Sequence, residues 1–441
     1  MPRQKPLDAW TEQVVDAFPH LSRPQATVLA LYSFGMFLAQ RCGLNSVVAA
    51  LGPFVAVGFH TLRSRLQEFY QPATAKSGSR RQELDVTSCF APLLAWVLKG
   101  WPSRRLALAL DATSLGAVFT VLSISVVYRG SALPVAWKIL PANVAHAWKP
   151  EWLALLAAFS RRMTPGWTVV VMTDRGLYAR WLYRAIVALG WHPLMRITKC
   201  SKFRRQGSKV GVPVGRFVPR PGRRWQGCGM AFPKKPEKRL GCTLLACWEA
   251  GYDEPWFVVT DLAPAQAESL WYGMRAWIEH GYKLLKSAGW HWDQTRMTDV
   301  DRAERLWLVL AVATRYVLAV GGDYEASQEV PVETIPELAP AAARGETAGT
   351  APSDRPRAAR RRGPERRPPP EPSGSRVRAS GTKERLVSVF RQGISALVAA
   401  LILSHALPRP HWRPEPWLEL RTQIETSQGQ PPTTLPINPS Q

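Results

Sequence analysis

Residues 106–140 read LALALDATSLGAVFTVLSISVVYRGSALPVAWKIL and contain three strand patterns in succession. A short apolar run covers 106–110, a segment rich in Val, Ile, Thr and Phe covers 117–128, and a third candidate covers 135–140. Short runs of β-branched and aromatic residues are typical of strands. The stretch therefore predicts three consecutive strands.

The pattern downstream of these strands alternates between helix and strand. A helical segment at 151–162 leads to a buried-type strand at 167–173, a second helix at 178–189 and a strand at 193–198. The predicted order is therefore βββαβαβ. Such an alternation is typical of an α/β fold.

The N-terminal part, residues 1–100, has a helical pattern. Apolar periodicity runs through 26–40 and again through 47–70, before a polar and basic break at 75–81. We therefore expect a helical N-terminal domain.

A β-rich insertion is expected at about 200–262. The helical signal disappears there, Gly, Pro, Lys and Arg become frequent, and strand-like pieces occur at 240–248 and 256–260. Two strong helices, 264–287 and 298–320, are predicted to follow.

The C-terminal part largely lacks the apolar periodicity of a packed domain. Residues 326–381 are rich in Pro, Ala and Arg, with nine arginines against three acidic residues between 352 and 378. This composition predicts disorder, and a nonspecific nucleic-acid tail and a solvated linker explain it about equally well. One more helix, 383–407, precedes a Pro-rich tail.

Length and charge limit the classes of function. The chain of 441 residues is long enough for two or three domains. It carries 57 Lys and Arg against 33 Asp and Glu, a formal net charge of +24, which favours a polyanionic partner. Nucleic acid is favoured over a membrane, because the first residues carry no apolar signal segment and the apolar stretches are too short or too interrupted to span a bilayer. We expect a soluble intracellular protein.

Two carboxylates directly follow predicted strands in a chain that is poor in acidic residues. Asp111 comes after the run at 106–110, and Asp174 after the strand at 167–173. Sites in α/β folds form at strand ends. Either residue alone is explained as well by a turn or a helix cap, but the pair suggests a site.

The predicted helix at 264–287 carries Tyr272, Arg275, Glu279 and Lys286. At about 100° per residue these four fall on one narrow stripe, apart from an apolar face. A solvated face with an incidental Arg275–Glu279 pair is the alternative. Glu268 is a rival carboxylate on the same stripe.

These residues resemble the DDE transposases of bacterial insertion sequences of the IS4 type. The helix reproduces the Tyr-x-x-Arg-x-x-x-Glu-x-x-x-x-x-x-Lys signature of that family, and Leu-Asp-Ala-Thr at 110–113 and Thr-Asp-Arg-Gly at 173–176 resemble its other two blocks. The similarity covers about 106–320, and Glu268 matches no family position. It implies an RNase H-like catalytic core interrupted by a β-rich insertion. The expected fold class is therefore α/β, with this core, a helical N-terminal domain and, from composition, a partly disordered basic C-terminal region.

The resemblance and the composition together divide the chain. The resemblance implies a helical DNA-binding domain for terminal-repeat recognition at 1–100 and an RNase H-like DDE catalytic domain at 101–325. Composition alone indicates a disordered Pro/Arg-rich segment at 326–381 and a C-terminal helix and tail at 382–441, which have no counterpart in the family.

The resemblance further implies a metal site and DNA contacts. Asp111, Asp174 and Glu279 would be the catalytic ligands of two Mg²⁺ or Mn²⁺ ions, which suit carboxylate oxygens. Tyr272, Arg275 and Lys286 would contact a phosphate at the transposon end. Relatives flip a base onto an insertion-domain Trp, for which Trp225 beside Arg223 and Arg224 is the first candidate, with Trp248 and Trp256 as core-like alternatives.

The implied activity is cut-and-paste transposition. Such an enzyme binds the inverted terminal repeats of its element, acts on double-stranded DNA at the transposon ends and the target, and works as a homodimer in the bacterial cytoplasm, at the nucleoid. Two alternatives stay open: a catalytically inactive, transposase-derived DNA-binding repressor, and an RNase H-like nuclease that needs only the two aspartates.

Overall fold

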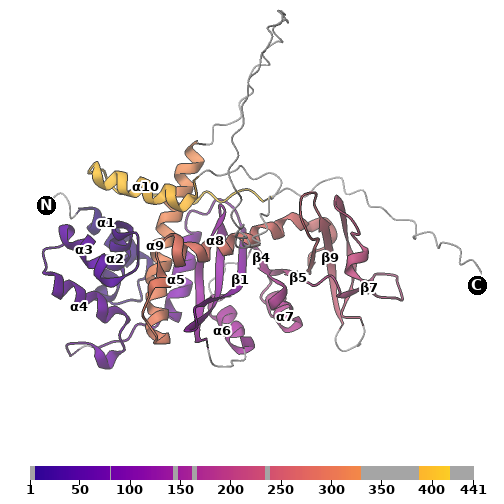
Figure 1. Ribbon diagram of the computed structural model, residues 1–441, viewed down its shortest axis with the longest axis horizontal. Coiled ribbons are helices and arrows are strands. Elements are labelled where there is room, and N and C mark those ends of the chain that lie inside the picture. The colour runs from indigo at the N-terminus through magenta and orange to yellow at the C-terminus, as the bar shows by residue number, and fades with distance from the viewer. Residues whose placement is uncertain are drawn as a thin grey trace, which may run out of the picture.

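The computed structural model describes residues 5–79, 81–142, 148–160, 166–233, 239–328 and 387–417. The molecule is elongated, with a cluster of helices at one end and a long sheet that continues to the other end (Figure 1). The predicted disorder at 326–381 falls almost entirely outside the described residues, and the division of the chain into domains stays a prediction.

Among the residues described before β1 (Arg105–Leu115), five α-helices make up the N-terminal cluster. They are α1 (Lys5–Ala17), α2 (Arg23–Ala39), α3 (Leu44–Leu51), α4 (Phe59–Tyr70) and α5 (Thr87–Leu98). The single periodic segment predicted at 47–70 is two helices, because Gly52 and Pro53 end α3 in a short 3₁₀ turn and Gly58 caps the start of α4.

Within the part of the chain that the structure describes, ten strands form one sheet. Its order is β3-β2-β1-β4-β5-β10-β9-β8-β6-β7. The strands are β1 (Arg105–Leu115), β2 (Phe119–Tyr128), β3 (Ser131–Pro141), β4 (Thr168–Thr173), β5 (His192–Arg196), β6 (Lys202–Arg205), β7 (Val212–Pro213), β8 (Arg223–Ala231), β9 (Leu240–Trp248) and β10 (Trp256–Thr260).

The first five strands confirm the predicted α/β core. β1 pairs with β2 and β2 with β3 in antiparallel fashion, whereas β1, β4 and β5 are parallel neighbours. The parallel strands are connected through α6 (Trp148–Ser160) and α7 (Arg180–Ala188). The observed order of elements is βββαβαβ, with the strand order of an RNase H-like core.

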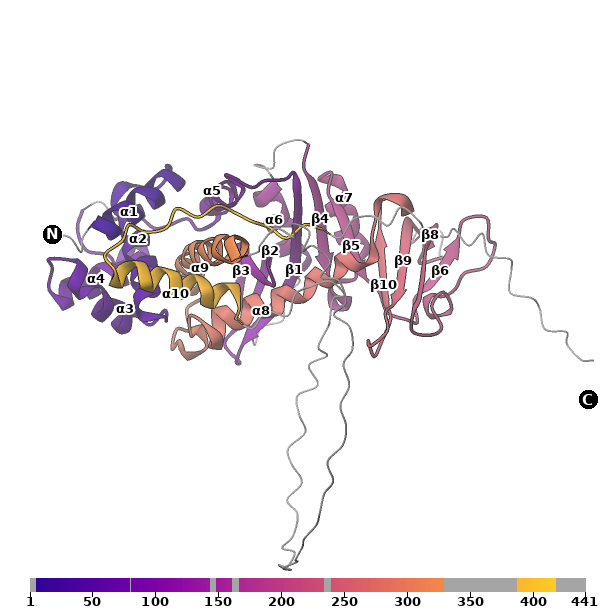
Figure 2. The same cartoon turned by 90° about the horizontal axis from the view of Figure 1, so that it is seen from above.

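The strands of the insertion extend this same sheet. β10 pairs antiparallel with β5, and β9, β8, β6 and β7 continue the sheet outward. The strand patterns at 240–248 and 256–260 coincide with β9 and β10. The insertion therefore continues the core sheet rather than forming a separate one (Figure 2).

The strand β10 leads to a segment that was predicted as one helix at 264–287. It is broken into 3₁₀ turns at Pro264–Gln266 and Ser269–Ala276, the helix α8 (Trp277–Lys283) and a π turn at Leu284–Ala288. Glu268 starts the second 3₁₀ turn by accepting a hydrogen bond from the backbone of Leu270. Apolar periodicity alone does not distinguish these tighter and wider turns from an α-helix.

The helix α9 (Val300–Gln328) is the central helix of the fold. It passes the length and composition test for a membrane span, but 94% of its most apolar 18-residue window is buried inside the protein. α9 packs on β3 and α2, and α10 (Val389–Ile402) crosses it. At the crossing, a Cβ on Gly321 would lie 1.8 Å from the Val389 carbonyl oxygen, and one on Gly393 would lie 2.0 Å from the Val317 carbonyl oxygen.

The chain after α10 returns over the molecule as an extended segment, residues 403–417 (Figure 2). Tyr316 of α9 donates a hydrogen bond to the Pro408 carbonyl oxygen, and Trp412 is buried against Tyr128 and Trp101. The helix predicted at 383–407 therefore ends earlier, at Ile402, and the residues that follow pack as extended chain.

Candidate active site

The strand register places the two aspartates side by side. β1 and β4 pair in parallel up to Leu110 and Thr173. Asp111 and Asp174 are the next residues, so their side chains lie at the same end of the parallel pair. β1 continues to Leu115 because it also pairs with β2. Asp111 was predicted to follow its strand, and instead lies within β1 at the level where β4 ends.

Asp111 is the more buried aspartate, with 15% of its side chain exposed. Its Oδ1 accepts the backbone N–H of Ala112 at 2.9 Å, and its Oδ2 faces Arg275. Burial raises the pKa of Asp111 to about 6, although Arg275 acts in the opposite direction. The Asp111 carboxyl group therefore loses its proton less readily than an ordinary aspartate, and additional positive charge beside it would favour the ionised form.

Asp174 is more exposed, at 39% of its side chain, and has two separate contacts. Its Oδ1 accepts the N–H groups of Gly176 at 2.9 Å and Leu177 at 3.1 Å, which caps the 3₁₀ turn Arg175–Leu177. This capping role is the alternative explanation that the sequence analysis gave for Asp174. It uses Oδ1 and leaves Oδ2 directed toward the site.

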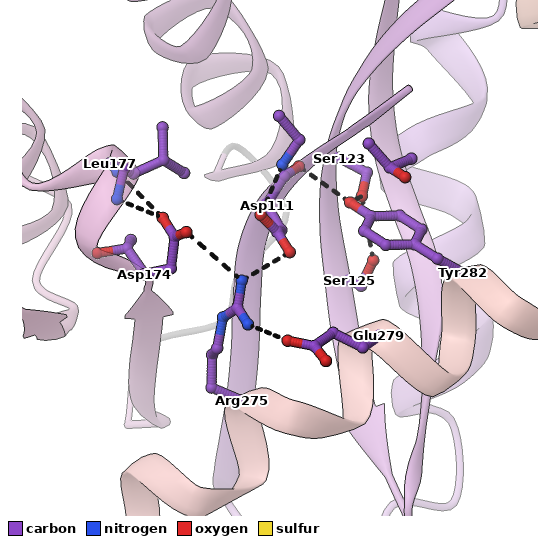
Figure 3. A network of polar contacts seen from close by, with 12 residues as sticks. Asp111, Ser123, Ser125, Asp174, Leu177, Arg275, Glu279 and Tyr282 are labelled. Atoms are coloured by element: carbon purple, nitrogen blue, oxygen red, sulfur yellow. Dashed lines mark hydrogen bonds and ion pairs between the residues drawn. The ribbon is translucent and has the colours of Figure 1, made fainter. Parts of the chain in front are cut away.

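Arg275 connects all three predicted carboxylates. Its Nη2 lies 2.7 Å from Asp111 Oδ2 and 3.9 Å from Asp174 Oδ2, and its Nη1 lies 2.7 Å from Glu279 Oε1. Figure 3 shows the guanidinium between the three side chains. Burial acts to lower the pKa of Arg275, but Asp111 first, then Tyr272 and the other two carboxylates, more than offset this and raise it. The structure therefore brings Asp111, Asp174, Glu279 and Arg275 together.

The helix α8 holds Glu279 over this strand end through a close contact with the sheet. Gly281 permits the approach, since a Cβ there would lie 2.6 Å from the Ala132 carbonyl oxygen. Next to it, the Tyr282 hydroxyl donates a hydrogen bond of 3.0 Å to the Asp111 carbonyl oxygen and lies 2.8 Å from Ser123 Oγ. The sequence reasoning missed Tyr282, although a position three residues after Glu279 lies on the same side of a helix.

The other two signature residues contact the protein around the aspartates. Tyr272 is only 5% exposed, and its hydroxyl donates to the Thr173 carbonyl oxygen at 3.1 Å. Lys286 Nζ donates to Thr113 Oγ1 at 2.7 Å and to the Ser114 carbonyl oxygen at 2.5 Å, and burial lowers its pKa. Both therefore fix the chain beside an aspartate, and their contact with DNA stays a prediction.

The predicted DNA contacts of the insertion lie on β8, away from the carboxylates. Trp225 is half-buried, with its ring 4.3 Å from that of Phe217. Arg224 Nε donates to Glu249 at 2.6 Å, whereas Arg223 is exposed. Of these three residues, Arg223 is the most accessible to a ligand, and all three roles stay predictions. Nearby, Arg204, Arg205 and Lys209 line a pocket of about 900 Å³.

The carboxylates fit a divalent metal site by the chemistry of their oxygens. Among the described residues, no group of three His, Cys, Asp or Glu side chains is already arranged to hold an ion. Arg275 explains this, because its guanidinium lies between the carboxylates. The Oδ2 atoms of both aspartates and the 61% exposed Glu279 side chain are nevertheless hard oxygen donors within reach of one group.

Comparisons with known proteins assign a family to part of the chain. Residues 102–315 match the family model described as "Transposase DDE domain". No curated protein matches the chain. A solved structure of piggyBac transposase in a synaptic complex with hairpin DNA is similar with 9% sequence identity and a TM-score of 0.30, over 74% of this chain and 80% of that one, a likeness too low to carry an argument. Residues 102–315 therefore form a transposase DDE domain.

Proposed function

We propose that the chain is the transposase of an insertion sequence of the IS4 type, which binds inverted terminal repeats and catalyses metal-dependent DNA cleavage and strand transfer. The family match supports the transposase class. The observation that carries the finer proposal is the convergence of Asp111, Asp174 and Glu279 on one guanidinium at the end of the β1–β4 pair. An RNase H-like nuclease would leave the full signature on 272–286 without a purpose.

Asp111, Asp174 and Glu279 are the proposed ligands of two Mg²⁺ or Mn²⁺ ions. Bound there, the ions would supply activation of a water or a 3′-hydroxyl and stabilisation of the leaving oxygen during attack on a phosphodiester. The protein's part is to hold the carboxylates in place. The N–H groups of Gly176 and Leu177 orient Asp174, and Tyr282 fixes the backbone of Asp111.

Cations at the same site are suited to position the DNA backbone. Arg275 offers a planar pair of donors that can bind a phosphate through two hydrogen bonds, and Lys286 adds a point charge. The net charge of +24 supports binding to the phosphate backbone along a longer path. Recognition of the repeats by the N-terminal helices, base contacts by the β8 residues and action as a homodimer on paired ends are parts of the same proposal.

A cleavage assay tests the proposal. The full-length protein is incubated with labelled DNA that carries the ends of its element, in Mg²⁺ or in EDTA, and nicked, hairpin and joined products are scored. We expect products with the wild type in Mg²⁺ and none in EDTA. Asp111→Asn and Glu279→Gln should abolish them, because each removes a charged ligand and leaves the shape of the site unchanged.

The matched control is Glu268→Gln. Glu268 lies on the same segment, and its Oε1 accepts a hydrogen bond from Leu270, an interaction that the Gln oxygen retains. Arg224 lies 3.6 Å from that oxygen and keeps its closer partner Glu249 in the variant. Cleavage should therefore survive in this variant. DNA binding without cleavage under any metal would favour the inactive repressor, and cleavage that survives Glu279→Gln would remove that residue from the ligand set.

A further inference from the structure

Arg275 occupies the position that a metal ion between the two aspartates would need. Each aspartate has its Oδ1 engaged by backbone N–H groups, so Oδ2 is the oxygen left over. Both Oδ2 atoms face the same nitrogen, Arg275 Nη2, at 2.7 and 3.9 Å. An ion with bonds of about 2.1 Å to these oxygens would lie against that nitrogen. The ion and the guanidinium therefore exclude each other by size and by charge.

The guanidinium is held firmly in this position. Only 13% of its side chain is exposed, and its other terminal nitrogen, Nη1, is bound to Glu279 at 2.7 Å. Its Nε is buried without a hydrogen-bond partner. A charged group in such surroundings can leave only if another anion accepts it, because an unpaired guanidinium inside the protein is strongly unfavourable.

A DNA phosphate is an anion suited to accept it. Guanidinium groups bind phosphate through two parallel hydrogen bonds, so one phosphate can satisfy both Nη1 and Nη2, the atoms of Arg275 that here contact the three carboxylates. A phosphate at the site would also lie beside the ions. The guanidinium of Arg275 therefore exchanges its carboxylate partners for a phosphate when DNA binds.

We infer that Arg275 is an internal counter-ion that keeps divalent metal out of the carboxylate site until a DNA phosphate draws it away, so that metal binding and DNA binding are coupled. The inference rests on the proposed function, since it takes the three carboxylates to be metal ligands. It makes Arg275 a positioning residue with two alternating partners. Because coupling is reciprocal, metal should also tighten DNA binding.

Mn²⁺ binding to the full-length protein tests this inference without any catalytic readout. The affinity is measured by electron paramagnetic resonance for the wild type and for Arg275→Gln, with and without a short double-stranded oligonucleotide. Without DNA, Arg275→Gln should bind Mn²⁺ about tenfold or more tightly than the wild type. The oligonucleotide should tighten Mn²⁺ binding to the wild type strongly, and to the variant much less, because there the counter-ion is already absent.

Two further variants separate the inference from simpler explanations. Arg175→Gln removes a positive charge one residue from Asp174, but Arg175 pairs with Glu254 and not with the site, so its Mn²⁺ affinity should stay within about twofold of the wild type. Arg275→Lys keeps the charge and should return the affinity toward the wild-type value. Melting of each variant in EDTA checks that it is folded. The Mn²⁺ affinity of the wild type with and without DNA is a further test that needs no variant.

Equal Mn²⁺ affinity in wild type and Arg275→Gln would overturn the inference while leaving the metal site in place. A rise in Mn²⁺ affinity in Arg175→Gln as large as in Arg275→Gln would also overturn the inference, since it would show a general effect of positive charge. An equal effect of the oligonucleotide on both proteins would contradict the exchange. No Mn²⁺ binding by any of the proteins, with or without DNA, would reject the proposed metal-dependent function together with the inference.

Discussion

Replacing Asp111 by Asn is expected to stabilise the metal-free protein. Burial holds the folded-state pKa of Asp111 at about 6, above the ordinary value of 3.8. The folded state therefore binds more protons than the unfolded state between about pH 4 and pH 6, and stability falls as the pH rises through this range. At about 1.4 kcal/mol per pKa unit, the ionised Asp111 costs up to about 3 kcal/mol above pH 6.

Asparagine has the shape of the carboxyl group without the charge, so it avoids this cost. In EDTA at pH 7.5 the Asp111→Asn variant should melt about 4 °C higher than the wild type, a rise scaled for a chain of this length. The gap should close as the pH approaches 4. Asp253→Asn is the control, because Asp253 is exposed and the loss of its charge should change the melting temperature little.

Differential scanning calorimetry in EDTA at several pH values measures the effect. Equal or lower stability of Asp111→Asn at pH 7.5 would show that the Arg275 pair outweighs burial. A gain that does not change between pH 4 and 7.5 would show that ionisation is not its cause. Either result would refute the reasoning. A gain in melting temperature that disappears as the pH falls would show that the ionised Asp111 lowers the stability of the protein, as functional residues often do.

Three further outcomes are expected. Gly321→Ala should lower stability by about 1–3 kcal/mol by pushing α10 off α9, whereas Gly241→Ala, whose Cβ meets nothing within 4 Å, should not; thermal melts that show equal losses would contradict the contact. Tyr282→Phe should cost about 1–2 kcal/mol and slow cleavage, through loss of its hydrogen bonds at Asp111; unchanged rates would exclude a positioning role. Lys286→Met should weaken binding of element-end DNA and flatten its salt dependence in a filter-binding titration; an unchanged salt slope would exclude a phosphate contact.

The sequence predicted the core of this fold because its strands are buried and regular. The runs predicted at 106–110 and 167–173 become parallel neighbours, and each is followed by an aspartate at the same level of the sheet. The βββαβαβ order alone leaves the neighbours of β1 open. The parallel register of β1 and β4 shows that Asp111 and Asp174, which the sequence suggested as a site at strand ends, lie at the same level.

The details of the segment 264–287, which carries Glu279, could not be predicted in this way. The stripe predicted on 264–287 assumed a constant rotation of about 100° per residue, whereas the segment passes through 3₁₀, α and π turns. Tyr272 consequently points into the protein toward Thr173, and the side chain that reaches the aspartates is Arg275. Such alternation depends on contacts with the sheet, as at Gly281, which a single sequence does not display.

The continuation of the core sheet into the insertion could not be predicted from the sequence either. The strand patterns of β9 and β10 were recognisable, but their partners were not, because antiparallel pairing of β10 with β5 is a long-range choice. The packing of residues 403–417 along α9 depends on isolated contacts such as Trp412 and Tyr316, which leave no periodic signal.

The central claim is that Asp111 holds a divalent metal during DNA cleavage. Asp111→Cys tests it most directly, since a thiolate prefers softer ions to Mg²⁺. With labelled element ends, the wild type should cleave in either Mg²⁺ or Mn²⁺. The variant should be inactive in Mg²⁺ and regain cleavage in Mn²⁺. Cleavage by Asp111→Cys in Mg²⁺ at the wild-type rate would contradict the assignment of Asp111 as a metal ligand.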